Sequence, residues 1–259
     1  MLKKLKLAQK LALVIGSILA VSLVILVGIT VFMSESAITE ATYGELEAIC
    51  SSNAKDIQTI FDESETASKD MQAFLEKSYQ KAEADPSLNI VPTDPEAVAL
   101  CQSSIYGRVM TPINYDIEVY LSETARNAAV NNEDLEGVGV MFEAYKFQED
   151  MKDYAFYIGA DHATGKVEPF GAYEVYSQEN YYKQAAEKMD SVVTDPYDYN
   201  GVSMVSYASP VIHNSELKGV VVADINVSNF DKVETTNEDY PSMYCTIYNA
   251  NEMIIYDSE

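Results

Sequence analysis

The residues that could carry chemistry in this chain are carboxylates and tyrosines, because other reactive side chains are few. The sequence has 41 acidic residues and 19 tyrosines but only two histidines and three cysteines. Asp224 differs from the other acids because it interrupts the apolar run Val220–Ile225. A lone carboxylate on a buried strand is costly, which favours a binding role for Asp224. The alternative is a strand-end aspartate held by backbone amides.

Metal and catalytic motifs are absent from the sequence. Cys50, Cys101 and Cys245 are far apart and form no C-x-x-C pair. There is no G-x-S-x-G, no Walker loop and no H-E-x-x-H, and a catalytic triad could use only His162 and His213, which we expect in solvated turns. We therefore expect no enzyme, no metal and no cofactor. An extracellular hydrolase is the weakest alternative.

The elements that must position Asp224 begin with a membrane segment. Residues 11–33 contain no charge, and a helix of that length crosses a hydrocarbon core of roughly 30 Å. A cleaved signal peptide is the competing interpretation, but its apolar region would be shorter. Lys3, Lys4, Lys6 and Lys10 precede the segment, which places the N-terminus in the cytoplasm and residues 34–259 outside.

The remaining chain is strongly acidic. The formal net charge is −24, and all 41 acidic residues follow residue 33. Such a surface repels phosphate backbones, so we exclude nucleic acid as a partner.

Helical patterns occupy the first part of the exterior region. Residues 34–85 have helix-forming composition, and Asp85-Pro86 ends them. Asn53 and Ser64 interrupt the apolar stripe of this helix, so the soluble region should be monomeric or weakly dimeric. Residues 94–132 predict further helix, with Thr93 or Asp94 as N-cap and a break at Thr111-Pro112.

From residue 137 onward the patterns favour strands. The expected strands cover 139–142, 154–158, a short segment to Tyr173 after a turn at 161–165, then 191–194, 202–212 and 219–227. A helix over 179–189 and a turn at 213–216 lie between them, and residues 243–248 and 253–256 begin another strand pair. This order predicts an α+β fold with an antiparallel sheet, helices on one face and the other face open.

Four motifs in this order resemble the double-Cache sensor domain of bacterial chemoreceptors. They are Glu179-Asn180-Tyr181-Tyr182-Lys183-Gln184-Ala185, Thr194-Asp195-Pro196-Tyr197, Ala208-Ser209-Pro210-Val211 and Gly219-Val220-Val221-Val222-Ala223-Asp224-Ile225. The resemblance implies a cytoplasmic tail (1–10), a transmembrane helix (11–33), a stalk helix (34–85), a PAS-like membrane-distal ligand-binding module (86–240) and the incomplete start of a membrane-proximal module (241–259). It also implies a second span and an output domain, methyl-accepting, kinase or cyclase, which do not follow in these residues. We therefore expect a receptor fragment or a truncated product.

The resemblance also implies a site. The family's aromatic pair falls on Tyr181 and Tyr182, its later tyrosine on Tyr197 and its strand aspartate on Asp224. The family's arginine, which holds an amino-acid carboxylate, falls on Glu179, and its second aspartate falls on Tyr199. We therefore expect a cationic or amine ligand, held by cation–π contacts and carboxylates. The alternative is that the tyrosines only pack a half-buried face.

These patterns predict extracytoplasmic small-molecule sensing by a receptor in a bacterial cell membrane. Residues 11–33 would anchor it, and tethering would favour a parallel homodimer. The alternative is an anchored solute-binding or adhesion protein without signalling output.

Overall fold

The computed structural model describes residues 6–159, 166–199, 201–233, 235–236, 238–249 and 252–259. It falls into two compact units, Met1–Ala54 and Lys55–Glu259. The expected turn at 161–165 with His162, and residues 250–251 between the last two expected strands, lie outside the described residues.

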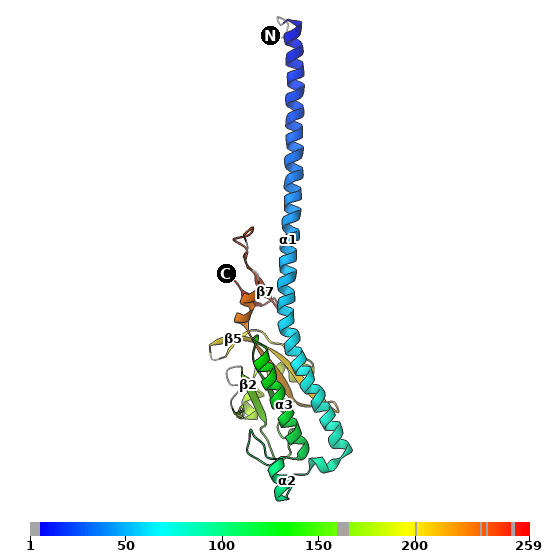
Figure 1. Ribbon diagram of the computed structural model, residues 1–259, viewed down its shortest axis with the longest axis vertical. Coiled ribbons are helices and arrows are strands. Elements are labelled where there is room, and N and C mark those ends of the chain that lie inside the picture. Colours follow the sequence, from blue (N-terminus) through cyan, green and yellow to red (C-terminus); the bar gives the residue numbers. More distant parts are fainter. Residues whose placement is uncertain (1–5, 160–165, 200, 234, 237, 250–251) are drawn as a thin grey trace. The chain divides into compact units, whose positions relative to one another are not determined.

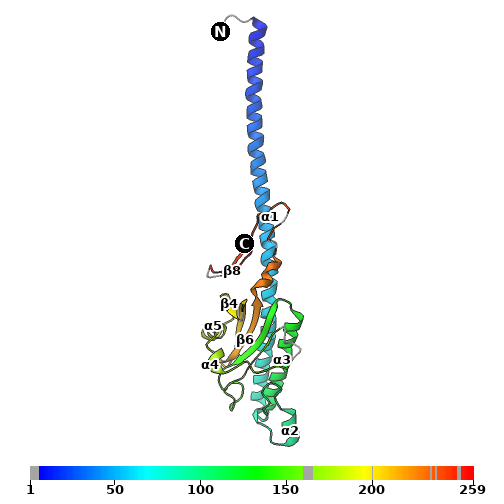
Figure 2. The same cartoon turned by 90° about the vertical axis from the view of Figure 1, so that its left-hand side faces the viewer.

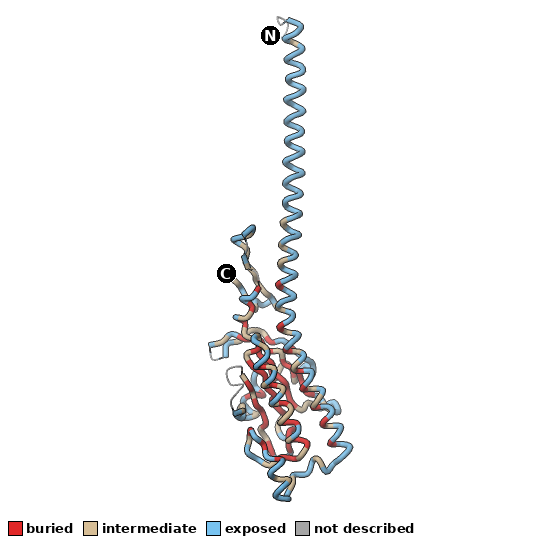
Figure 3. The backbone as a smooth tube through the Cα atoms, in the orientation of Figure 1, coloured by how far each residue is buried: buried red, intermediate tan, exposed pale blue. Residues whose placement is uncertain are grey.

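The first unit contains the beginning of helix α1 (Leu7–Ala84). An 18-residue stretch near its N-terminus has a mean hydropathy of 2.8, and 0% of that stretch is buried (Figure 3). In the part of the chain that the structure describes, α1 is the one helix long and apolar enough to cross a membrane. A helix in the core of a soluble protein would bury such a stretch, and this one does not.

The second unit is built on an antiparallel sheet (Figure 1). Its strand order is β2-β1-β6-β5-β3, and β4 also pairs with β5. The strands are β1 (Leu135–Phe142), β2 (Ala155–Gly159), β3 (Val192–Val193), β4 (Tyr197–Tyr199), β5 (Val202–His213) and β6 (Glu216–Asn226). The predicted α+β class is confirmed. The structure adds β4, whose Tyr-Asp-Tyr sequence has no apolar alternation to indicate a strand.

Helices cover both faces of this sheet (Figure 2). One core lies between β6 and the helices α1 and α3 (Pro112–Asn131). It contains Met71 and Leu75 of α1, one face of α3, and Val221, Ala223 and Ile225 of β6. The intervening residues Val220 and Val222 pack on the opposite face against α4 (Tyr173–Tyr176) and α5 (Asn180–Lys188). The prediction that one face stays open is therefore wrong, because alternate residues of a central strand are apolar on both sides.

The helix ends follow local chemistry. α1 ends at Ala84, and Asp85 caps a 3-10 helix (Pro86–Asn89). Asp94 caps α2 (Pro95–Leu100), and Thr111 caps α3. The expected helix over 94–132 is wrong between residues 101 and 111. There the Ser103 hydroxyl accepts from the Ile105 and Tyr106 amides and so competes with helical hydrogen bonds.

The expected strand leading to Tyr173 is also wrong. Only an isolated bridge joins Pro169 to Phe156, and Tyr173 begins α4. Proline has no amide hydrogen with which to extend a ladder. The last two predicted strands are confirmed as the hairpin β7 (Thr246–Tyr248) and β8 (Ile254–Asp257).

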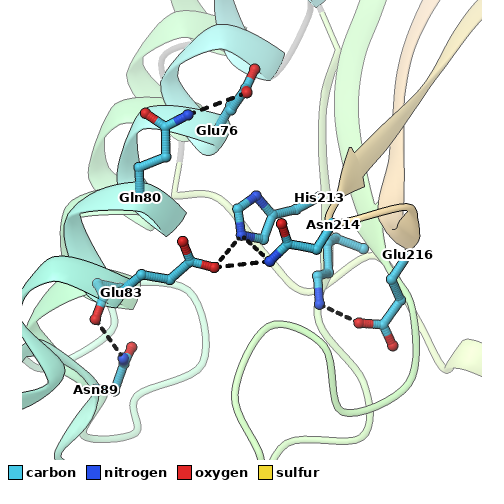
Figure 4. A network of polar contacts seen from close by, with 9 residues as sticks. Glu76, Gln80, Glu83, Asn89, His213, Asn214 and Glu216 are labelled. Carbon is cyan, nitrogen blue, oxygen red and sulfur yellow. Dashed lines mark hydrogen bonds and ion pairs between the residues drawn. The ribbon is translucent and has the colours of Figure 1, made fainter.

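The β5–β6 hairpin turns at Asn214 and Ser215, which confirms the predicted turn. The expectation of a solvated His213 is wrong, because its side chain is only 12% exposed. The His213 ring lies 4.9 Å from the Tyr79 ring, and its Nε2 lies 2.9 Å from Oε1 of Glu83. Asn214 donates to the same Glu83 oxygen, so both of these polar contacts join the turn of the hairpin to α1 (Figure 4).

Candidate ligand-binding site

A pocket of about 440 Å³ lies on the face of the sheet that carries α4 and α5. This volume is in the range of small-molecule sites. Its lining residues come from β1, β2, β4, β5, β6 and α5 and from the segments around them: Glu136, Met141, Tyr157, Gly159, Phe170, Gly171, Val175, Tyr176, Glu179, Tyr181, Tyr197, Asp198, Tyr199, Val202, Met204, Val222 and Asp224.

Asp224 lies in this pocket and is buried, with 7% of the residue exposed. It follows Val220 and Val222 on the α5 side of β6. The Ser206 hydroxyl, on the neighbouring strand, donates to Oδ1 of Asp224 at 2.6 Å. The Tyr197 hydroxyl lies 2.6 Å from the Ser206 hydroxyl and 3.3 Å from the same Asp224 oxygen.

The burial of Asp224 penalises the charged form of its carboxyl group. Burial raises the pKa of the Asp224 carboxyl, and hydrogen bonds from Ser206, Tyr157 and Tyr197 oppose that rise. These described partners are all hydroxyl groups, so none supplies a positive charge. A cation entering the pocket would therefore meet a carboxylate that lacks a counter-ion among them.

Tyr157 reaches this carboxylate because the neighbouring strand has a glycine. The Tyr157 side chain crosses β1, where a Cβ at Gly137 would lie 2.5 Å from the ring. Gly137 is paired with Asp224 across β1 and β6. A residue with a side chain at position 137 would displace the Tyr157 ring from the pocket floor.

Glu136 lies at a β-bulge of β1 and lines the pocket. The pairing of β1 with β6 shifts between Leu135 and Gly137, so Glu136 has no cross-strand partner on β6. Such bulges redirect a side chain. Glu136 lines the pocket half-buried, and its Oε2 accepts from the Asn226 amide at 3.3 Å.

The two adjacent tyrosines of helix α5 have different surroundings. Tyr181 lines the pocket, whereas Tyr182 is absent from the described lining. The buried Tyr182 donates its hydroxyl to Oε1 of Glu143 at 2.7 Å. Successive residues of a helix lie about 100° apart, so one of the pair faces the cavity and the other faces the core.

The outer part of the pocket is also acidic. Glu179, the N-cap of α5, and Asp198 of β4 are exposed and line it together with Tyr199. Four carboxylates therefore line the pocket, and none of its described lining residues is lysine or arginine.

The structure brings together four of the five predicted site residues, Glu179, Tyr181, Tyr197 and Asp224, and their role stays a prediction. Sequence reasoning missed Glu136, Tyr157 and Asp198. The alternation of 155–159 could have indicated Tyr157, because Phe156 and Ile158 face the other core. No sequence pattern around Glu136 predicts the β-bulge there.

Residues 121–232 match the family model of the methyl-accepting chemotaxis protein-like first PDC sensor domain. This part of the chain is similar to PDC sensor domains of that family. The match contains every strand of the sheet and the whole pocket lining, which agrees with the double-Cache resemblance. No curated protein sequence matches the chain.

Several solved structures resemble the chain at low identity. The periplasmic sensory domain of the Campylobacter jejuni chemoreceptor Tlp1 is 11% identical, with a TM-score of 0.48 over 80% of this chain and 69% of that one. The extracellular domain of the histidine kinase mmHK1S-Z3 is 19% identical, with a TM-score of 0.45 over 76% and 68%. The Pseudomonas aeruginosa amino acid chemoreceptor PctC, in complex with GABA, is 14% identical, with a TM-score of 0.39 over 76% and 74%. Each TM-score is below one half, so the assignment depends on the sequence match.

Proposed function

We propose that this PDC-like domain detects a small cationic ligand outside the cell, with Asp224 as the central contact. The observation that carries the proposal is the composition of the pocket, which has four carboxylates and no basic residue among its described lining residues. Binding a cation would provide the buried Asp224 carboxylate with a counter-ion, and a desolvated ion pair of this kind contributes strongly to affinity.

The aromatic lining supports the same ligand class. Five tyrosines and one phenylalanine line the pocket: Tyr157, Tyr176, Tyr181, Tyr197, Tyr199 and Phe170. Aromatic faces attract ammonium groups within about 6 Å of the ring centre. An α-amino acid is disfavoured, because its carboxylate would meet Glu179 where the family has an arginine.

The domain would act at a membrane surface. In this proposal residues 11–33 form an uncleaved anchor, the N-terminal lysines are cytoplasmic, and residues 34–259 are extracytoplasmic and non-catalytic. The division at residues 85 and 240 into stalk, distal module and start of a proximal module belongs to the same proposal. A parallel homodimer would form through tethering in the membrane.

A thermal-shift screen of the full chain in detergent tests the ligand class, because a ligand that binds only the folded state raises the unfolding temperature. The screen compares amines, amino acids, organic acids and purines at equal concentration. We expect the largest shifts from amines. An organic acid as the strongest stabiliser would contradict the proposal.

A further inference from the structure

The carboxylates of the pocket fall into two sets that differ in depth. Asp224 is buried and Glu136 is half-buried, and we call these the inner carboxylates. Glu179 and Asp198 are exposed, and we call these the outer carboxylates. All four line one cavity, so its floor and its mouth both carry negative charge.

The inner carboxylates come from neighbouring strands. Asp224 is paired with Gly137, and the bulge places Glu136 directly beside that pair. Tyr157 lines the same floor and donates its hydroxyl to Asp224, and burial and the charges of Asp224 and Glu136 raise the pKa of that hydroxyl. One ammonium group at the floor would therefore be shared between the inner carboxylates.

Each outer carboxylate has a tyrosine of the pocket lining close to it in the sequence. Tyr181 lies in the first turn of α5, two residues after the N-cap Glu179, and Tyr197 precedes Asp198 within β4. Tyr181 lines the same pocket as Asp224 and Glu179, and burial and the charges of both carboxylates raise the pKa of its hydroxyl. An apolar linker would contact these rings between two charged ends.

We propose that the ligand carries two positive charges, one at the inner carboxylates and one at the outer carboxylates, joined by a short aliphatic chain. This inference rests on the proposed function and narrows it from cations in general to diamines. A monoamine would satisfy Asp224 and leave Glu179 and Asp198 unpaired.

Three probes of similar length separate the possibilities: diaminobutane, n-butylamine and γ-aminobutyrate. They end in a second ammonium, a methyl group and a carboxylate. Calorimetry on the full chain in detergent at about 0.15 M salt limits long-range attraction by the acidic surface. We expect the best diamine, among those with three to six carbons, to bind at least tenfold more tightly than n-butylamine, and γ-aminobutyrate to bind more weakly still.

Glu179→Gln identifies the outer contact. It should reduce the affinity for the best diamine about tenfold and change that for n-butylamine less than threefold. Glu187→Gln is the matched control, because Glu187 lies exposed on the same helix outside the described lining and the variant removes the same charge. Glu187→Gln should leave both affinities within twofold.

The outcomes distinguish the two proposals. Equal affinities for n-butylamine and the best diamine would overturn the two-charge inference while leaving the cation proposal intact. An equal loss of diamine affinity in Glu179→Gln and Glu187→Gln would also overturn it, because the effect would then be one of surface charge. If neither the diamines nor n-butylamine bind, and γ-aminobutyrate or an organic acid does, both proposals fail.

Discussion

At Asp224, a carboxylate is buried among hydroxyl groups and has no described counter-ion. Ser206 donates to it at 2.6 Å, Tyr197 contacts the Ser206 hydroxyl at 2.6 Å, and Tyr157 reaches it across Gly137. This arrangement keeps the carboxylate in place without neutralising it, which is what a binding site for a cation requires.

The raised pKa of Asp224 predicts a pH dependence. An ordinary aspartate titrates near about 3.9, and a raised pKa in the folded state means that the folded protein binds this proton at higher pH than the unfolded chain does. Burying the charged Asp224 side chain lowers the stability of the folded protein, and this loss of stability disappears as the pH falls through the pKa of Asp224 in the folded state. Cation affinity should fall over the same interval, because the ligand needs the carboxylate.

Calorimetry from about pH 7.5 down to pH 4 measures this loss of affinity, and Asp224→Asn should remove its Asp224-dependent part. Affinity that stays constant until the pH reaches the range of an ordinary aspartate would contradict the assignment.

Tyr182 and Tyr197 are predicted to differ in role. Tyr182→Phe removes a hydrogen bond to the Glu143 carboxylate and should cost about 1.5–3 kcal/mol of folding free energy, while cation affinity stays within twofold. Tyr197→Phe removes a hydroxyl beside Ser206 and Asp224 and should lower affinity. Urea unfolding and calorimetry on both variants test this. A larger affinity loss in Tyr182→Phe than in Tyr197→Phe would show that the roles are reversed.

The sequence supports part of the candidate site. An aspartate in an apolar strand and a tyrosine at an alternating position can be identified from spacing. Tyr182 could not be separated from Tyr181 because both are aromatic and adjacent, and only the orientation of α5 decides between them. Glu136 depends on a bulge, which is set by pairing between distant strands.

At the scale of elements, the β5–β6 turn holds Asn214 at φ 52° and Ser215 at φ 61°. Left-handed backbone of this kind favours glycine, above all at the second position of a two-residue hairpin turn. Ser215→Gly should therefore raise stability by about 0.5 kcal/mol, net of the entropy that glycine adds to the unfolded chain.

Asn214→Gly is the matched comparison. This substitution also places glycine at a left-handed backbone position, but it removes the side-chain amide that donates to Glu83 at 2.9 Å. Asn214→Gly should therefore raise the stability of the protein less than Ser215→Gly does, as measured by thermal unfolding of both variants. A loss of stability in Ser215→Gly would mean that the turn is not strained at this residue.

The elements differ in how far the sequence predicts them. Capping residues and prolines gave the C-terminal end of α1, the start of α2 and both ends of α3 to within a residue or two, since those signals are local. The loop over 101–111 and strand β4 were missed because their conformation depends on partners elsewhere, Glu118 for the loop and β5 for the strand.

At the scale of the whole molecule, the proposal requires one orientation in the membrane. Protease added outside intact cells should cleave within residues 34–259 and leave the N-terminal lysines intact, because the positive charges precede the apolar segment. Immunoblotting with tags at each end gives the measurement. Protection of residues 34–259 in intact cells, with cleavage only after lysis, would contradict an extracytoplasmic sensor.

The central claim is that Asp224 binds the cation, and calorimetry of the strongest amine from the screen on Asp224→Asn tests it most directly. Asparagine keeps the size of the side chain and an oxygen to accept from Ser206, so the fold should be retained, with a melting temperature equal to or above that of the wild type. The account predicts a loss of about 2 kcal/mol or more in binding free energy, the scale of a lost charge-assisted contact. Unchanged affinity in a folded Asp224→Asn protein would contradict it.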